Sequence, residues 1–494
     1  MKKKKLIIII AASVLALAIL ACAAIAAAAM ATPAVYDNTF VGGLGEKFER
    51  LNTVEGRKIV IVGGSSAAFG LDSTLIEKYT GMPVVNFGLY AALGTKLMMD
   101  LSRANIGPGD VVVLAPEMDA QTMSLYFNPD ATLMAMDGNF GMLTHLRGGN
   151  LFSLLGAMPR FAGEKIGYLT SGEKPTGSGA YDSSYFNEQG DLTYPRPENV
   201  MGMYYDPNTM IHLSADMPAP EFIAYINEYV QFCRSQGAEI YFGFCPMNEM
   251  ALAEGTTPES IAAFEDHLKT VLGCSLLGTA SDHIFSAEFF FDSNFHLNDA
   301  GVKHHTVTLV KELLLAIGIP AFVNEELPAA PALPEKSIRY FGDADENAQY
   351  FTFELTEFGQ RITGLTEAGK VQKTLTMPVA YDGYRVALLG EGALKDGTCE
   401  KLIIPAGFEQ FITETTSSMM TLENGSFIGA SSLKELWIYN RHEATVMPPA
   451  SFEGVSKDFV VHVPDGSSYG EGYFWGERKL NGINLIFIQD ITMN

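Results

Sequence analysis

Two serines and one histidine in this sequence have neighbours that suit nucleophilic chemistry. Ser65 and Ser66 follow the β-branched run Lys58–Val62 within a glycine-rich stretch. His296 lies ahead of a helical pattern, with the carboxylate of Asp292 four residues before it. Because a serine nucleophile needs a base, and the base needs an orienting group, this combination predicts a Ser-His-Asp site for acyl chemistry.

A glycine-rich turn between a strand and a helix also suits phosphate binding. This stretch has neither the G-x-G-x-x-G spacing of dinucleotide-binding turns nor the lysine of a P-loop. We therefore expect it to present a serine at the carboxyl end of a parallel sheet, where ligands bind. The next helix would point its first amides at a developing oxyanion.

Over about residues 57–318 the chain resembles the SGNH (GDSL-type) hydrolase superfamily. Gly64-Ser65-Ser66 followed by Gly70 matches that family's Gly-Asp-Ser-x-x-x-Gly block with Ser in place of Asp. The resemblance implies that Ser66 is the nucleophile, with Ser65 as the second choice.

Two further blocks of the family have counterparts here. Asn86-Phe87-Gly88 resembles the second block, whose glycine amide helps to form the oxyanion hole. Asn298 and Gly301 fit the end of the last block. The alternative for the second block is an ordinary turn after a strand.

The chain departs from the family pattern in two places. The family has Asp three residues before the histidine, where this chain has Ser293, so Asp292 must reach from one residue further away or the site works as a dyad. The third block normally supplies an Asn, whereas Ala115–Asp119 contains none. Glu117 in that segment would repel an oxyanion unless it points elsewhere or is protonated.

With these two departures, the chain resembles the membrane-anchored SGNH proteins that act in acylation of extracellular polysaccharides and teichoic acids. The resemblance implies that Ser66 attacks an ester carbonyl, His296 takes its proton and Asp292 holds the imidazole. The amides of Ser66 and Gly88 would stabilise the oxyanion. The expected partner is an acylated glycan of the cell envelope or a related ester, with no metal or organic cofactor. The alternative is a non-catalytic surface protein in which a degenerate SGNH domain binds glycan.

The elements that must position these residues alternate between strands and helices, which is typical of a parallel sheet covered on both faces. We expect a three-layer α/β domain over residues 32–320, interrupted by a folded insertion near residues 127–217. The expected strands are residues 58–62, 83–86, 110–114 and 239–244. The expected helices are residues 72–79, 95–104, 219–236, 258–272 and 299–317.

The second half of the chain has a different sequence pattern, without the alternation of strands and helices. Residues 321–350 form a proline-containing linker, and residues 351–494 show short alternating runs separated by Gly and Pro. An imperfect repeat places Phe427 and Phe452 25 residues apart. The repeats resemble the surface-antigen type of leucine-rich repeat, which implies a stacked β-rich domain that binds a protein or glycan partner. The alternative is a generic small β domain.

The N-terminus predicts a membrane anchor. Lys2 to Lys5 precede the uncharged segment Leu6–Met30, so residues 1–31 read as a cytoplasmic lysine run and a transmembrane helix, with the rest of the chain outside the cell. A cleaved signal peptide and a lipoprotein modified at Cys22 are the alternatives.

The composition of the chain argues against several other classes of protein. The 494 residues contain 33 Lys and Arg against 57 Asp and Glu, a formal net charge of −24, which disfavours nucleic-acid binding. The five cysteines are too sparse for a disulfide scaffold or a zinc site.

Overall fold

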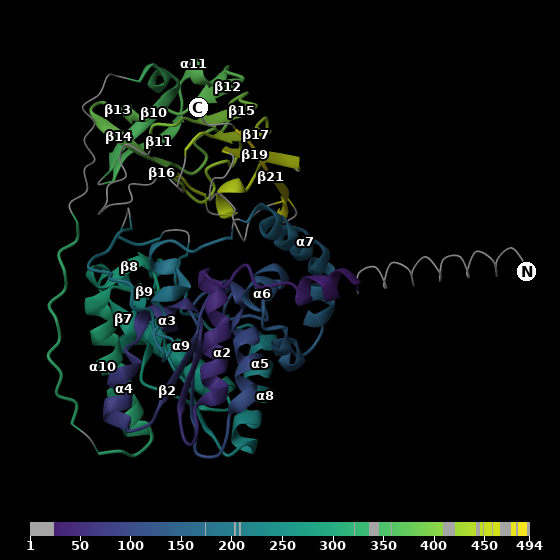
Figure 1. Cartoon of the computed structure of the whole chain (residues 1–494). Coiled ribbons are helices and arrows are strands. Elements are labelled where there is room, and N and C mark those ends of the chain that lie inside the picture. The colour runs from purple at the N-terminus through teal and green to yellow at the C-terminus, as the bar shows by residue number, and fades with distance from the viewer. Residues whose placement is uncertain are drawn as a thin grey trace, which may run out of the picture. The chain divides into compact units, whose positions relative to one another are not determined.

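The computed structural model describes most of the chain as two compact units (Figure 1). The first unit comprises Met1–Pro197, Ile211–Phe290 and Asn294–Pro331, and the second comprises Glu198–Met210, Phe291–Ser293 and Ala332–Asn494. The structure describes all residues except 1–23, 173, 202–203, 207–208, 321, 335–344, 357, 409–419, 441–444, 448, 457, 465–475, 481–482 and 492–494.

A parallel sheet forms the centre of the first unit, with the strand order β2-β1-β3-β4-β6. Its strands are β1 (Ile59–Gly63), β2 (Val84–Gly88), β3 (Val111–Ala115), β4 (Glu239–Phe242) and β6 (Ser275–Leu276). The four predicted strands are confirmed within one or two residues. Every residue of β1, β2 and β3 is buried, which explains why these strands read as continuous apolar runs.

Helices from both halves of the unit bury the sheet. The five predicted helices are present as α4 (Ser73–Thr80), α5 (Thr95–Ser102), α8 (Pro220–Ser235), α9 (Pro258–Val271) and α10 (Asp299–Ala316). One core cluster joins alternate β1 residues to Ile76 of α4 and Val310 of α10. Because strand side chains alternate between faces, the intervening β1 residues Val60 and Val62 are buried on the opposite face.

Several helices were not predicted from the sequence. They are α2 (Leu44–Thr53), ahead of the first predicted strand, α3 (Ser65–Gly70), and within the insertion α6 (Pro129–Ala135) and α7 (Asn150–Ser171). The insertion follows β3, as expected, and α7 is its longest helix at 22 residues.

The transmembrane part of the predicted fold class is wrong for the described chain. Within the described residues, no helix is both long enough and apolar enough to cross a membrane. Of the predicted segment, only residues 24–31 are described as helix. Eight residues span about 12 Å, well short of a hydrocarbon core. Residues 6–23 of the predicted span lie outside the described residues.

The second unit contains two ladders of mostly parallel strands. One follows the order β10-β11-β14-β16-β18, with β13 paired to β14, and the other follows β12-β15-β17-β19-β21-β20. The first ladder consists of β10 (Phe351–Thr356), β11 (Gly359–Leu365), β13 (Ala380–Tyr381), β14 (Tyr384–Leu389), β16 (Met420–Leu422) and β18 (Thr445–Val446). The second consists of β12 (Thr374–Thr376), β15 (Lys401–Ile404), β17 (Glu435–Ile438), β19 (Asp458–Pro464), β20 (Gly476–Leu480) and β21 (Ile483–Ile491).

From β14 to β19 the chain places strands in the two ladders alternately, so each turn stacks on the previous one. Phe427 and Phe452 occupy equivalent places in successive turns, with ring centroids 5.6 Å apart. Both are buried, as are Leu433 and Val461, so these four side chains belong to the core of the unit. Trp437 is only partly buried and stacks on His462.

Candidate active site

The turn that carries the two serines connects β1 to α3 and depends on two glycines. A Cβ atom on Gly64 would lie 2.2 Å from Oε2 of Glu117. A Cβ atom on Gly63 would lie 2.5 Å from the carbonyl oxygen of Ala115. Both contacts are too short for any larger residue, so the glycines let the turn pack against the end of β3. This packing fixes the position of Ser65, the first residue of α3.

Ser65 and His296 meet at this turn. Oγ of Ser65 lies 2.8 Å from Nε2 of His296, and each residue is only 6% exposed. The imidazole stacks on Phe69, with ring centroids 3.9 Å apart and planes inclined by 10°. Phe69 follows Ser65 by one turn of α3. The same short helix therefore positions the hydroxyl and the ring that holds its partner.

Ser66, which the family block implied as the nucleophile, is engaged elsewhere. Its amide donates a hydrogen bond of 2.8 Å to Oε1 of Glu117, and the residue is 1% exposed. The structure thus places the second choice, Ser65, against His296. The spacing of the motif did not separate the two because adjacent helical residues point about 100° apart, and only the position of the partner selects one of them.

Glu117, at the end of β3, is buried beside the serine turn. Burial raises the pKa of its carboxyl group above the usual value, against the opposing effect of the Ser66 amide, and the nearby Asp119 raises it further. Oε2 of Glu117 has no hydrogen-bond partner among the described residues. This environment favours the neutral carboxyl, which is one of the two states expected from the sequence.

The two amides predicted for the oxyanion hole both donate within the protein. The Ser66 amide bonds to Glu117, and the Gly88 amide donates to Oδ1 of Asn86 over 3.2 Å. Ser65 is the first residue of α3, so its own amide has no acceptor within the helix.

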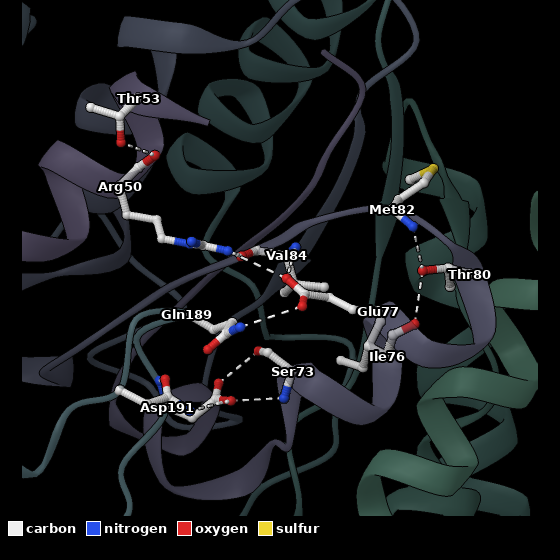
Figure 2. Close-up of polar contacts among 11 residues, drawn as sticks. Arg50, Thr53, Ser73, Ile76, Glu77, Thr80, Met82, Val84, Gln189 and Asp191 are labelled. Carbon is white, nitrogen blue, oxygen red and sulfur yellow. Dashed lines mark hydrogen bonds and ion pairs between the residues drawn. The ribbon is translucent and has the colours of Figure 1, made fainter. Parts of the chain in front are cut away.

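Asn86 ties the end of β2 to the serine-bearing helix. Its Nδ2 atom donates to the carbonyl oxygen of Ala67 and to Oδ1 of Asp191, each over 2.8 Å. Asp191, from the insertion, also accepts both the amide and the hydroxyl of Ser73 over 2.7 Å (Figure 2). The insertion therefore braces the carboxyl end of the sheet, which the sequence did not reveal.

A second carboxylate shown in Figure 2 fixes the start of β2. Glu77 of α4 accepts the amide of Val84 over 2.8 Å and Nη2 of Arg50 over 3.3 Å. It also accepts Nε2 of Gln189 over 3.3 Å. Both ends of β2 are thus held by carboxylates that lie outside the strand.

The histidine loop is fixed by the helix that follows it. His296 begins the short strand β9 (His296–Leu297), and Asn298 caps α10 by accepting the Gly301 amide over 3.0 Å. Nδ2 of Asn298 donates to the Phe290 carbonyl over 3.1 Å. A Cβ atom on Gly301 would lie 2.3 Å from the carbonyl oxygen of Phe289. Asn298 and Gly301, noted in the sequence, thus have a structural reason to be present.

Asp292 lies on β8 (Phe290–Ser293) and is half-buried. It belongs to the short segment Phe291–Ser293, which clusters with the second unit, whereas His296 belongs to the first. Its role as the carboxylate that orients His296 stays a prediction.

A second histidine, His305 on α10, contacts the far end of α3. Its Nδ1 atom lies 2.8 Å from the carbonyl oxygen of Gly70. Burial lowers the pKa of His305 to about 3, so the ring is neutral and donates from Nδ1. No sequence motif marked this residue, because one buried histidine on an apolar helix face looks like any other core position.

No family model matches this chain, and no curated protein matches it. Among the described residues, no group of three or more His, Cys, Asp or Glu side chains could hold a metal ion. The geometry of Ser65 and His296 is therefore the basis for the chemistry proposed below.

Proposed function

We propose that the first unit is a serine esterase or O-acyltransferase in which Ser65 is the nucleophile and His296 is the base. The observation that carries the proposal is the 2.8 Å contact between Oγ of Ser65 and Nε2 of His296 at the carboxyl end of a parallel sheet. Gly64 lets the serine turn pack against Glu117, and Phe69 stacks on the His296 ring, so both partners of the contact are held in place.

In the proposed reaction, Oγ of Ser65 attacks an ester carbonyl and its proton passes to Nε2 of His296. The carbon–oxygen bond to the leaving alcohol then breaks, and His296 returns the proton to that alcohol. Water or an acceptor hydroxyl attacks the acyl-Ser65 ester in the second half of the cycle. The Ser65 amide is the candidate donor to the oxyanion, and Asp292 is the candidate orienting group.

The proposed substrate is an acyl ester of a cell-envelope polysaccharide. The support is the resemblance of the sequence blocks to the SGNH superfamily. With Ser65 in that role, Gly63-Gly64-Ser65 aligns with the family's Gly-Asp-Ser, so Gly64 stands at the Asp position and Phe69 stands where the block has its last Gly. The Glu117 carboxyl group fills the space that a side chain at position 64 would need.

The test compares two adjacent serines. We expect the full chain to cleave p-nitrophenyl acetate and a fluorophosphonate probe to label Ser65, as mapped by mass spectrometry. Ser65→Ala should lose about 1,000-fold or more in kcat/KM, because the nucleophile is removed. Ser66→Ala is the matched control and should retain most of the activity, since its hydroxyl does not face His296.

Two outcomes contradict the proposal. Equal activity of Ser65→Ala and wild type would exclude Ser65 as the nucleophile. A wild type that neither cleaves any acetyl ester tested nor reacts with the probe would favour the glycan-binding alternative.

A further inference from the structure

A cavity of about 720 Å³ lies in the first unit, lined by α5, residues 144–148 and α8. None of its lining residues belongs to the candidate active site. Helix α5 runs from the carboxyl end of β2 toward the amino end of β3, so Arg103, which follows α5, lies toward the opposite end of the sheet from Ser65. The cavity therefore lies apart from the candidate active site.

Arg103 is the unusual residue of this cavity. Its side chain is 6% exposed, yet neither Nε nor Nη2 has a hydrogen-bond partner among the described residues. The guanidinium group lies over the rings of Tyr229 and Phe232, at 5.1 and 4.7 Å from their centroids. Nε and Nη2 share one edge of the planar group, and this edge binds a carboxylate through two parallel hydrogen bonds.

The acidic residues near Arg103 form no hydrogen bond with this edge, whose two nitrogens are buried. Oδ2 of Asp100 already accepts Nζ of Lys96 over 2.7 Å and the Arg147 amide over 3.1 Å, and the Tyr225 hydroxyl donates to Oδ1. Asp100 is therefore satisfied without Arg103.

Glu228 is the only acidic lining residue left to interact with Arg103. Its Oε1 atom is 3.7 Å from Nη2 of Arg103, beyond hydrogen-bond distance, and 2.9 Å from Nη1 of Arg147. The Glu228 side chain is 53% exposed, so it can turn into solvent when another anion arrives.

The charge of the cavity favours a singly charged anion. Arg103 and Arg147 of the lining, together with Lys96, which pairs with Asp100 beside the cavity, carry three positive charges, and Asp100 and Glu228 carry two negative charges. One net positive charge remains in a protein whose formal net charge is −24. A dianion such as phosphate would meet two carboxylates, whereas a carboxylate needs only the free edge of Arg103.

We infer that this cavity binds a small organic carboxylate, held by Nε and Nη2 of Arg103. Its volume lies within the usual range for small-molecule sites and accommodates a sugar acid. Glu228 stands beside the same edge of Arg103 and competes with the ligand for it.

Calorimetric titration of the full chain with sodium glucuronate tests this inference, with glucose as the neutral match. We expect glucuronate to bind and glucose not to bind. Arg103→Lys keeps the charge and removes the two-donor edge, so it should weaken binding by about 10-fold or more. Glu228→Gln removes the competing charge and should tighten binding severalfold, an effect that a purely structural Arg103 would not produce.

Three results would overturn the inference: no binding of glucuronate to either wild type or Glu228→Gln, unchanged affinity in Arg103→Lys, or equal binding of glucuronate and sulfate. Binding seen only in Glu228→Gln would support it, because it would show that Glu228 occupies the site. If Arg103→Lys fails to fold, as judged by its melting curve, the Glu228→Gln comparison decides alone. Ester cleavage plays no part in any of these measurements.

Discussion

A single buried carboxyl group explains much of the geometry around Ser65. Glu117 accepts the Ser66 amide, fills the space beside Gly64 and belongs to the segment Ala115–Asp119, which lacks the Asn of the block it was compared with. Because its pKa is raised by burial, the neutral form does not oppose a developing negative charge as a carboxylate would. Glu117 is therefore best understood as a positioning residue for the serine turn.

Exchange of Glu117 for its neutral isostere tests this role. Glu117→Gln keeps an oxygen that can accept the Ser66 amide, so we expect ester cleavage within a few-fold of wild type. Glu117→Ala leaves the buried amide of Ser66 without its acceptor and opens a hole, so kcat/KM should fall by about 10-fold or more. Steady-state kinetics on p-nitrophenyl acetate provide the measurement. Equal loss in both variants would show that the ionised carboxylate itself is needed.

The contact between a serine and His296 also shows how far the sequence alone can predict the site. The proximity of a serine to His296 was predictable because both residues fall at the ends of recognisable elements, while their catalytic roles stay a proposal. Which of the two serines faces His296 was not predictable, since it depends on Glu117, which follows β3 and lies 51 residues after Ser66.

Among the elements, those with a strong apolar pattern were predictable. The buried strands β1 to β3 and helices such as α10 followed directly from their sequence patterns. Helix α3 was missed because only six small or apolar residues form it, too few to show a helical period. Helix α7 was missed because Gly and Pro residues occur throughout the insertion, and Pro159 lies inside the helix itself.

Helix α10 contains a second buried acid, and its titration gives a test of the fold. Burial, together with the nearby Asp282, raises the pKa of Glu312 to about 8. Both of its oxygens lie 3.2 Å from Nε2 of His283, whose own pKa burial lowers to about 4. Between these values both groups are neutral, so the contact is a hydrogen bond rather than an ion pair.

The contribution of Glu312 to stability should therefore fall as the pH rises from about 4.5 to about 8, whereas His283 and His305 contribute in the opposite direction below pH 6.5. In that window the folded protein holds a proton on Glu312 that the unfolded chain has lost, so a rising pH favours unfolding. Glu312→Gln cannot ionise, so the difference in stability between wild type and this variant isolates the Glu312 contribution and should shrink as the pH rises. Urea unfolding followed by far-UV circular dichroism at pH 5, 6.5 and 8 measures it. A variant with the same slope as wild type would show that Glu312 is ionised in the folded protein.

At the scale of the whole molecule, the two units have separate cores and different sources of stability. The first unit is built on one parallel sheet, whereas the second depends on stacking between successive turns, as between Phe427 and Phe452. Stacked repeats cannot bury their apolar faces singly, so damage to one turn should spread to its neighbours. The proposed nucleophile and base both belong to the first unit.

Phe452→Asp should therefore unfold much of the second unit and leave ester cleavage unchanged. Phe452 is 2% exposed, and burying a charge in its place costs about 4 kcal/mol or more. Trp437 lies in the second unit, and the chain's other tryptophan, Trp475, lies outside the described residues, so intrinsic tryptophan fluorescence carries no signal from a tryptophan of the first unit.

Phe452→Leu, which keeps an apolar side chain, is the matched control and should retain the fluorescence of wild type. Lost activity together with lost fluorescence in Phe452→Asp would mean that the second unit completes the site. The residues to examine would then be Phe291–Ser293, because this segment clusters with the second unit and contains Asp292. Asp292→Asn in the otherwise intact chain should reproduce the loss of activity, without the change in fluorescence, if that carboxylate orients His296.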